Sequence, residues 1–404
     1  MLPNIDFRNV TKLDYCCSKC NATIVARNRL CKHCFREIVG NAAETWTSMR
    51  PHIDELIVES QRDADYVYQF IEWIPYENFT NVEFVAQGGF SRVYKAIWKQ
   101  GYWECLADPD DTTRYFERRG SMEVALKEQK HSVAVHLKLE HCLLREKQLY
   151  GLSVNPETGQ IILVMRYMSG GDLRQLLIKN PVEFTWSKRI EQLSTLMRDL
   201  QTIHKAGFIH KDFHSGNVLW TFDDCQDYEL CISDFGLSGP ANNEDEKITG
   251  FVPYMAPELL LGRPKSTASD TYAFGIVMWE FSSGEPAFFE CRDDDLAFFK
   301  QKITQDHLRP VPIEGTPDCY VNLMTRCWAP DPKDRPTAEE VFHTLLLFIE
   351  MNDITSPKFN DTVFEQFEMA EELRLQKGSC ERFHHEIYTS VIIDDDEFVP
   401  TVEL

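Results

Sequence analysis

The chain has 404 residues, of which 43% are hydrophobic, and a formal net charge of −22 at pH 7. Its length and apolar content suffice for more than one domain with a buried core, whereas its acidity argues against nucleic acid or an anionic membrane surface as the main partner. No run of about 18 apolar residues is present, so the sequence predicts no membrane-spanning helix.

The first candidate site is a group of cysteines near the N-terminus. Cys17 and Cys20 are separated by two residues, as are Cys31 and Cys34, and ten residues lie between the pairs. Four thiolates in this spacing match the tetrahedral coordination of a structural Zn²⁺ ion. Residues 1–10 lack the apolar core of a signal peptide, so we expect a cytoplasmic or nuclear protein whose reducing surroundings favour metal binding. Disulfide-bonded or unliganded cysteines are the alternatives.

Two segments connect this head to the rest of the chain. Residues 53–68 carry apolar side chains near helical period, which predicts a helix. We expect the apolar residues that follow, Trp73, Ile74 and Phe79, to dock the helix on the next domain. Further on, residues 99–122 are rich in charged and turn-forming residues, which predicts a surface loop or an extended hairpin.

The middle of the chain predicts a group of strands around a glycine-containing turn. Residues 85–94 read as strand, turn and strand, and Gly88 and Gly89 in the turn would let the backbone approach a phosphate group closely. The apolar residues 124–126 end at Lys127, a cation that can neutralise phosphate oxygens, and a further apolar run covers residues 161–164.

Two motifs in the second half carry the chemistry. Asp212 and Asn217 lie within residues 210–217, and Asp234 follows Asn217 by seventeen residues, directly before Phe235 and Gly236. Phosphoryl transfer needs one carboxylate to orient the attacking hydroxyl and oxygen ligands to hold Mg²⁺ against the phosphates. These three side chains supply those groups in the required order and spacing.

The motifs together resemble the protein kinase superfamily over about residues 80–350. Residues 210–217 match its catalytic loop with Lys for Arg, residues 234–236 its D-F-G, and residues 124–127 its V-A-I-K strand. Residues 256–258 match A-P-E, and Asp270 matches the helix-borne Asp that braces the catalytic loop. Cys327–Trp328 and Arg335–Pro336 resemble the corresponding motifs of the tyrosine-kinase-like branch. The cysteine head and the sequences of residues 73–76 and 212–217 resemble those of a fungal group within this branch.

The resemblance implies an α+β, two-lobed kinase fold with an antiparallel β small lobe and a mainly α large lobe. We expect a zinc-ribbon-like module at residues 1–45, a helical linker docking on the kinase at 46–78, the kinase domain at 79–350 and an acidic, partly disordered tail at 351–404.

The resemblance also implies the roles of the site residues. Asp212 would be the catalytic base, and Asn217 and Asp234 the Mg²⁺ ligands. Lys127 would clamp the phosphates, paired with Glu140. Glu258 and Arg335 would form a buried ion pair, which with Asp270 is structural. ATP contacts would come from Val85, Gly88, Gly89, Val93, Ala125, Lys127, Met165 and Met168.

Several departures from the family pattern leave alternatives open. Glu146 competes with Glu140 as the partner of Lys127, although it would leave almost no helix after it, and either could be an ordinary solvated charge. Phe251 stands where serine/threonine kinases usually carry Thr, and His214 replaces their usual Lys. Neither residue is typical of tyrosine kinases, so the substrate residue type stays open.

The favoured function is an ATP-dependent protein kinase that acts on protein substrates, most simply at Ser or Thr, in intracellular signalling. The alternative is a pseudokinase scaffold that binds nucleotide weakly, because Ala86 and Ser91 replace the outer glycines of the phosphate loop. A third reading makes the locally basic head a nucleic-acid module, against which the acidity of the chain weighs. Signalling partners could bind through the head or the acidic tail.

Overall fold

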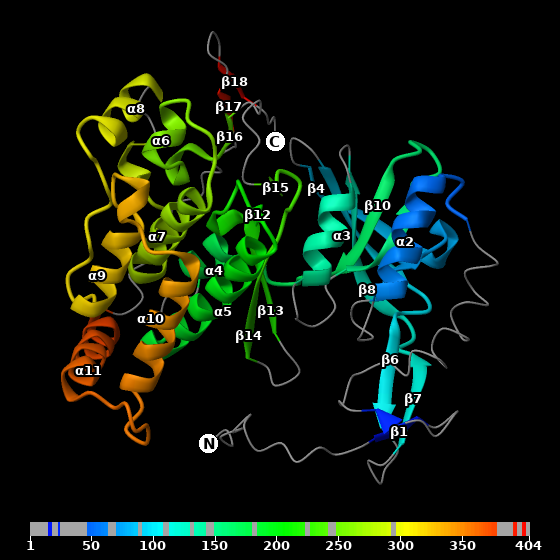
Figure 1. Ribbon diagram of the computed structural model, residues 1–404, viewed down its shortest axis with the longest axis horizontal. Coiled ribbons are helices and arrows are strands. Elements are labelled where there is room, and N and C mark those ends of the chain that lie inside the picture. Colours follow the sequence, from blue (N-terminus) through cyan, green and yellow to red (C-terminus); the bar gives the residue numbers. More distant parts are fainter. Residues whose placement is uncertain are drawn as a thin grey trace. The chain divides into compact units, whose positions relative to one another are not determined.

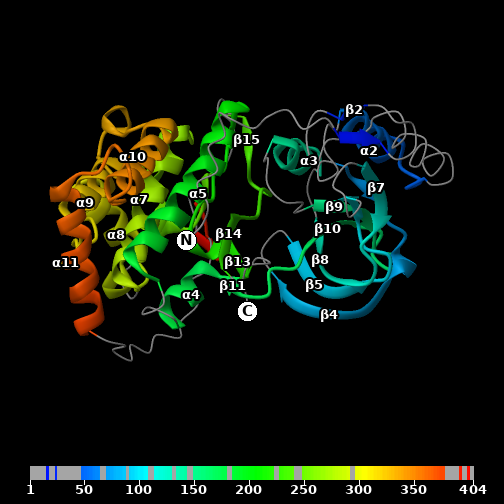
Figure 2. The ribbon, with the colours of Figure 1, turned by 90° about the horizontal axis from the view of Figure 1, so that it is seen from below.

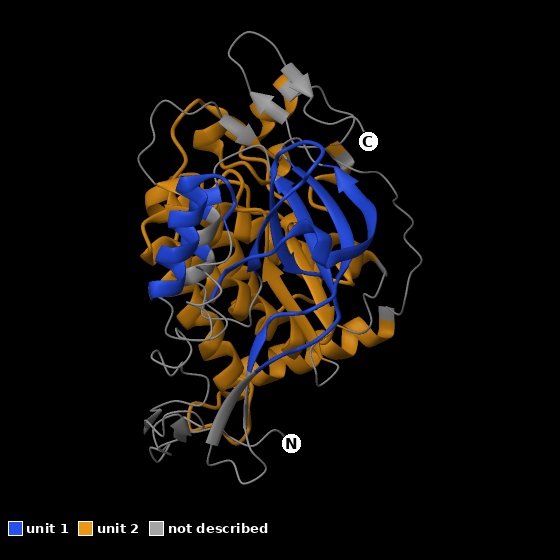
Figure 3. Ribbon diagram, turned by 90° about the vertical axis from the view of Figure 1, so that its right-hand side faces the viewer, with its two compact units in different colours: residues 1–167 blue, residues 168–404 orange. Residues whose placement is uncertain are grey.

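The computed structural model describes residues 15–17, 23–24, 47–63, 70–87, 91–107, 113–129, 133–142, 149–179, 184–222, 227–240, 248–291, 296–377, 391–393 and 398–400. They divide into two compact units, residues 1–167 and 168–404 (Figure 3). Several sequence predictions lie outside the described residues: those for Cys20, Cys31, Cys34, Gly88, Gly89 and Glu146, and those for the side chains of Cys17 and Glu140.

Unit 1 is built on a six-stranded sheet of order β3-β9-β10-β8-β5-β4. The strands are β3 Glu72–Trp73, β4 Phe79–Gln87, β5 Ser91–Trp98, β8 Met122–Gln129, β9 Leu149–Val154 and β10 Ile161–Arg166. Neighbouring strands are antiparallel, and Figure 2 shows β4, β5 and β8 as curved strands side by side. The exception is β3, which precedes the kinase-like region and pairs with β9 in parallel. The sheet is thus wider than the antiparallel sheet that the sequence predicts.

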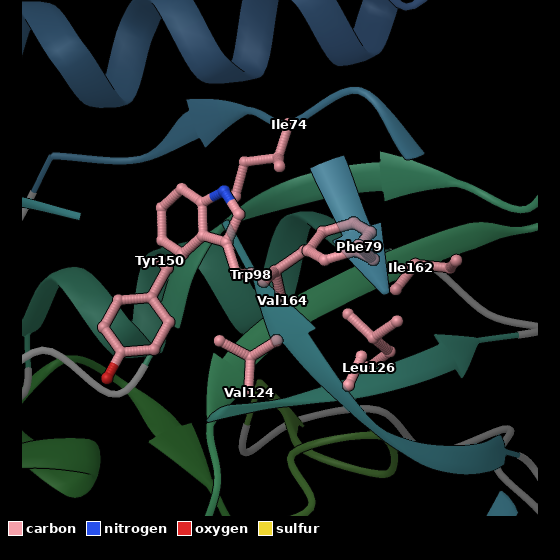
Figure 4. Close-up of a cluster of buried hydrophobic side chains, with 9 residues drawn as sticks. Ile74, Phe79, Trp98, Val124, Leu126, Tyr150, Ile162 and Val164 are labelled. Carbon is pink, nitrogen blue, oxygen red and sulfur yellow. The ribbon is translucent and has the colours of Figure 1, made fainter. Parts of the chain in front are cut away.

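One face of this sheet carries an aromatic and aliphatic core. Val124 and Leu126 alternate with Ala125 and Lys127 along β8, so the two pairs point to opposite faces. The buried pair packs with other apolar side chains of the sheet, which Figure 4 shows: Ile74, Phe79, Trp98, Tyr150, Ile162 and Val164. Burial of each large side chain contributes about 1.5–3 kcal/mol, which holds the strands in register.

A helix from the segment before the sheet packs against strands β9 and β10. Helix α2 (Pro51–Asp63) begins where the Asp54 carboxylate accepts hydrogen bonds from the Ser48 backbone N–H (2.8 Å) and the Thr47 hydroxyl (2.6 Å). Its buried Ile53 and Ile57 pack in one cluster with Val133, the first residue of helix α3 (Val133–Cys142), and with apolar residues of β9 and β10. The segment before the kinase-like region therefore forms part of the core of unit 1.

The charged insertion forms the antiparallel hairpin β6 (Trp103–Ala107) and β7 (Thr113–Arg118), seen in Figure 1. Strand β7 also pairs with β1 (Tyr15–Cys17), and β1 pairs with β2 (Thr23–Ile24). Arg118 donates two hydrogen bonds to the Glu72 carboxylate (2.7 and 3.0 Å) and lies over the Trp103 ring. This contact ties the base of the hairpin to β3.

Unit 2 is mainly helical. Its helices are α4 Leu173–Lys179, α5 Trp186–Lys205, α6 Pro257–Leu260, α7 Thr267–Ser283, α8 Leu296–Thr304, α9 Asp318–Cys327, α10 Ala338–Met351 and α11 Asp361–Lys377. Helix α7 is buried almost throughout; it starts at a capping box of Ser266 and Ser269 and ends at Gly284, whose φ of 71° places it in the left-handed region. In α11, the buried Phe367 packs against Trp186 and Phe348, so the packed helical part extends beyond residue 350.

Three small sheets complete unit 2. The first is β11 (Gly171–Asp172), β13 (Val218–Phe222) and β14 (Tyr228–Ile232), and the second is β12 (Phe208–Ile209) with β15 (Gly239–Pro240). The third joins β16 (Ile248–Gly250) to two strands from the end of the chain, β17 (Val391–Ile393) and β18 (Phe398–Pro400). None of the described helices is both long enough and apolar enough to cross a membrane.

Candidate active site

The site of unit 2 is centred on the loop between β12 and β13. Within it, Lys211 has a φ of 70°, a backbone conformation that costs a non-glycine residue about 1–3 kcal/mol. The buried Asp270 at the start of α7 holds this loop, because its carboxylate accepts hydrogen bonds from the backbone N–H groups of His210 (2.8 Å) and Lys211 (3.1 Å). His204 Nε2 donates a third bond to the same carboxylate (2.8 Å). Asp270 thus imposes the shape of the loop.

Asp212 lies in this loop, and its carboxylate is largely buried. Asn217 Nδ2 donates to its backbone carbonyl (2.9 Å) and to its Oδ2 (3.2 Å). Within the described part of the chain, Oδ1 is buried and has no hydrogen-bond partner. Burial raises the pKa of Asp212, but His214, whose Nε2 lies 3.7 Å from Oδ2, and Lys265 outweigh it, so the pKa is lowered. Asp212 therefore presents an ionised acceptor oxygen.

A β-hairpin brings Asn217 and Asp234 together. Strand β13 begins directly after Asn217, and β14 ends just before Ser233, so the pairing of Val218 with Ile232 places both ends side by side. The backbone N–H and the hydroxyl of Ser233 both donate to the Asn217 carbonyl (2.8 and 2.9 Å). Asp234 follows with a φ of 59° and accepts a hydrogen bond from the Gly236 N–H (3.2 Å).

This pair can hold a divalent cation. Both hydrogen bonds from the Asn217 side chain use its nitrogen, so the amide oxygen faces away from Asp212. Amide and carboxylate oxygens are the ligands that Mg²⁺ prefers. No group of three or more His, Cys, Asp or Glu side chains with metal-binding geometry occurs among the described residues, so a cation here would take its remaining ligands from substrate phosphates and water.

Two residues that depart from the kinase pattern meet beside Asp212. The rings of His214 and Phe251 pack edge to face with centroids 5.2 Å apart, and Tyr254 lies 5.5 Å from the same imidazole. The guanidinium of Arg174 covers the Phe251 ring. His214 Nδ1 accepts the Gly216 N–H (3.1 Å), which directs a protonated Nε2 toward Asp212. The aromatic residues therefore fix the orientation of the imidazole.

A buried chain of hydroxyls extends from the loop to α7. Tyr254 donates to Glu280 Oε1 (2.6 Å) and accepts from the Ser215 hydroxyl (2.9 Å). Burial, followed by the charge of Glu280, raises the pKa of Tyr254, and burial also raises the pKa of Glu280. The phenol therefore stays protonated at neutral pH. The local sequence pattern does not mark Ser215, Tyr254, Glu280 or the nearby Lys265, because the role of each residue depends on a distant partner.

Glu258 and Arg335 form a buried bidentate ion pair, with both nitrogen–oxygen distances at 2.7 Å. Arg335 also donates to the carbonyls of Ala329, Ala268 and Pro330. Because every donor group of Arg335 meets an acceptor, the pair ties helix α6 to the loop before α10.

All but one of the described residues expected to contact ATP belong to unit 1. Lys127 on β8 is buried and lies opposite Val93 on β5 and Leu163 on β10. Ala125 shares the sheet face of Lys127 and pairs with Met165, which is half-buried. Val85 is exposed on β4. Met168, the first residue of unit 2, is half-buried, and the backbone of Glu140 belongs to α3.

A β-sheet unit and a helical unit that carries this catalytic loop and hairpin define the two-lobed kinase fold. Residues 79–345 match the family model described as protein tyrosine and serine/threonine kinase. The chain belongs to this protein kinase family, and the resemblance to its tyrosine-kinase-like branch is confirmed.

Similar proteins with assigned names are also named as protein kinases. The chain is 27% identical over 289 residues to the probable serine/threonine-protein kinase pats1 of Dictyostelium discoideum, covering 69% of this chain and 9% of that protein. It is 28% identical over 282 residues to mitogen-activated protein kinase kinase kinase 10 of Xenopus laevis (65% and 26%). It is 30% identical over 185 residues to the dual specificity protein kinase zakA of Dictyostelium discoideum (43% and 24%). The chain thus spans only a minor part of each relative.

Proposed function

We propose that the chain is an ATP-dependent protein kinase that phosphorylates serine or threonine hydroxyls of protein substrates. The observation that carries the proposal is Asp212 Oδ1, a buried, ionised oxygen without a hydrogen-bond partner in the described residues. Buried acceptors in native proteins are nearly always satisfied, so a hydroxyl donor is the natural complement. Among the relatives, pats1 is named a serine/threonine kinase and zakA a dual specificity kinase, and both names support serine or threonine as an acceptor residue.

In this reaction the substrate oxygen forms a bond to the γ-phosphorus of ATP while the bond from that phosphorus to the β,γ-bridging oxygen breaks. ADP leaves, and the hydroxyl proton passes to Asp212. Asn217 and Asp234 would hold Mg²⁺, which when bound neutralises charge on the phosphate oxygens. Lys127 would pair with the α- and β-phosphates. His214 and Asn217 orient the Asp212 carboxylate for the hydroxyl.

The test is phosphate transfer from labelled ATP with Mg²⁺ to a mixed panel of serine, threonine and tyrosine peptides. We expect Asp212→Asn to lower turnover by a hundredfold or more, since a positioned base contributes on the order of 10²–10⁴, while nucleotide affinity stays near that of the wild type. The matched control is Asp331→Asn, the same change at an exposed carboxylate that accepts the Lys333 N–H (2.9 Å).

Two outcomes would contradict the proposal. Retention of more than about a tenth of turnover in Asp212→Asn would remove this residue as the base. Wild-type protein that binds ATP but labels no peptide would favour the pseudokinase scaffold.

We further propose that Cys17, Cys20, Cys31 and Cys34 hold one structural zinc ion, because four thiolates complete a tetrahedral shell. Freshly purified protein should contain about one zinc per chain, measured by elemental analysis. Replacing Cys17 and Cys34 together by Ser should remove it, and absence of zinc from the wild type would refute the site. The cytoplasmic or nuclear location and signalling partners at this head remain predictions.

A further inference from the structure

The last strands of the chain pair with a strand next to the catalytic loop. Strand β17 is antiparallel to β16, with Ile248 opposite Ile393, Thr249 opposite Ile392 and Gly250 opposite Val391. Strand β18 then pairs with the other edge of β17 (Figure 1). Strands β17 and β18, together named the β17–β18 hairpin, thus occupy an edge of β16 that would otherwise offer unpaired backbone groups.

This edge lies beside the proposed catalytic base. A Cβ atom placed on the buried Gly250 would come within 3.5 Å of Asp212 Oδ1 and 3.9 Å of the Lys211 carbonyl oxygen. Phe251, the next residue, packs on His214. Opposed residues of an antiparallel pair have Cα atoms about 4.5–5.5 Å apart, so the backbone of Val391 passes close to the point where a substrate hydroxyl has to approach Asp212.

An exposed strand edge binds extended peptides through main-chain hydrogen bonds, with little dependence on their sequence. A protein substrate that presents its hydroxyl to Asp212 in extended form would use the edge of β16. The segment that holds this edge, Val391–Ile393, carries no hydroxyl group, so it can fill the edge without being consumed by the reaction.

We propose that the β17–β18 hairpin is a built-in competitor of the protein substrate, pairing with β16 in place of an extended substrate strand. The inference rests on the proposed kinase activity. A tethered segment reaches an effective concentration of about 1 mM. If its dissociation constant is about 0.1 mM, within the usual range of KM values, it raises the KM for a peptide substrate about tenfold.

The test uses the full chain with Ile392→Pro. Because β17 lies between β16 and β18, the N–H of its central residue points to one neighbour or the other, and proline removes that donor. The matched control is Val402→Pro, a proline placed after the hairpin. We expect Ile392→Pro to lower the KM for a peptide substrate about tenfold with the KM for ATP unchanged. A synthetic peptide of residues 391–400, which carries no hydroxyl side chain, should inhibit this variant competitively against the peptide substrate.

Each of the following results would overturn the inference. The peptide KM could be unchanged in Ile392→Pro, or the free peptide could inhibit competitively with ATP. The wild type could also phosphorylate residues 388–390 stoichiometrically, which would make the tail a substrate. Hydrogen exchange gives a readout that needs no activity, since the amides of residues 248–250 should exchange faster in Ile392→Pro. If neither protein labels any peptide while exchange responds as expected, the kinase proposal fails and the hairpin pairing stands. An exchange rate that does not change removes the pairing itself.

Discussion

Replacing Asp270 by Asn tests whether the catalytic loop is held in its strained shape from α7. The side chains are nearly equal in size, but the amide offers one acceptor oxygen where the carboxylate offers two. If the amide oxygen takes the place of Oδ2, its NH₂ group opposes the Lys211 N–H; in the other orientation it opposes the His210 N–H. Either way, one buried backbone donor loses its acceptor.

The cost follows from these bonds. A hydrogen bond to a charged group contributes about 1.5–3 kcal/mol, and an unsatisfied buried donor costs about 1–3 kcal/mol. The two effects overlap, so we expect a loss of about 3 kcal/mol in the free energy of unfolding. Lys211 keeps its φ of 70° only while its surroundings impose it. The loop should then relax and displace Asp212, and a shift of about 1 Å can lower turnover about a hundredfold.

Urea unfolding at pH 7 measures the stability, and steady-state kinetics with a peptide substrate measure kcat and both KM values. We expect kcat to fall about a hundredfold while the KM for ATP changes little, because Asp270 braces only the loop. Asp331→Asn is again the control and should stay within about 0.5 kcal/mol of the wild type. A variant destabilised by this amount that keeps half of the wild-type kcat would refute the positioning role. Unchanged stability would show that the carboxylate charge and the lost hydrogen bond contribute nothing net to stability.

Three further predictions concern the rest of the kinase region. Arg335→Ala leaves the buried Glu258 carboxylate without its partner, and we expect urea unfolding to show that the free energy of unfolding falls by about 3–5 kcal/mol. The control, Arg326→Ala at an exposed position, should lose less than about 0.5 kcal/mol. A loss below about 1 kcal/mol in Arg335→Ala would argue against a net stabilising role of the ion pair. Burial lowers the pKa of His210 below its unfolded value of about 6.5, so the unfolded state binds more protons at a pH between the two pKa values. The stability that His210 contributes is therefore complete above about pH 6.5 and declines as the pH falls. If the melting temperature of His210→Asn has the same pH dependence as that of the wild type, this prediction is wrong. Glu140→Gln should lower turnover severely and Glu146→Gln mildly if Glu140 holds Lys127; the reverse order would assign the pair to Glu146, and indifference to both changes would favour a scaffold.

The motif spacing was enough to identify Asp212, Asn217 and Asp234 as one group. They lie within a short loop and at the two ends of one hairpin, where the chain path between them is brief and the motif spacing constrains it. The sequence also pointed to Glu258 and Arg335, but only through the family resemblance, because no local pattern links two residues so far apart. The assignments of Glu140 and the four cysteine ligands remain predictions.

The contacts between distant segments could be seen only once the chain had folded. It shows that the two departures, His214 and Phe251, pack on each other beside Asp212, that α2 packs against α3, and that β17 pairs with β16. Local sequence fixes backbone preferences over a few residues, whereas a distant partner is selected by packing and by the pairing of backbone groups that remain unpaired once each segment has formed. Packing and backbone pairing depend on the whole fold, so these contacts could not be predicted from the local sequence.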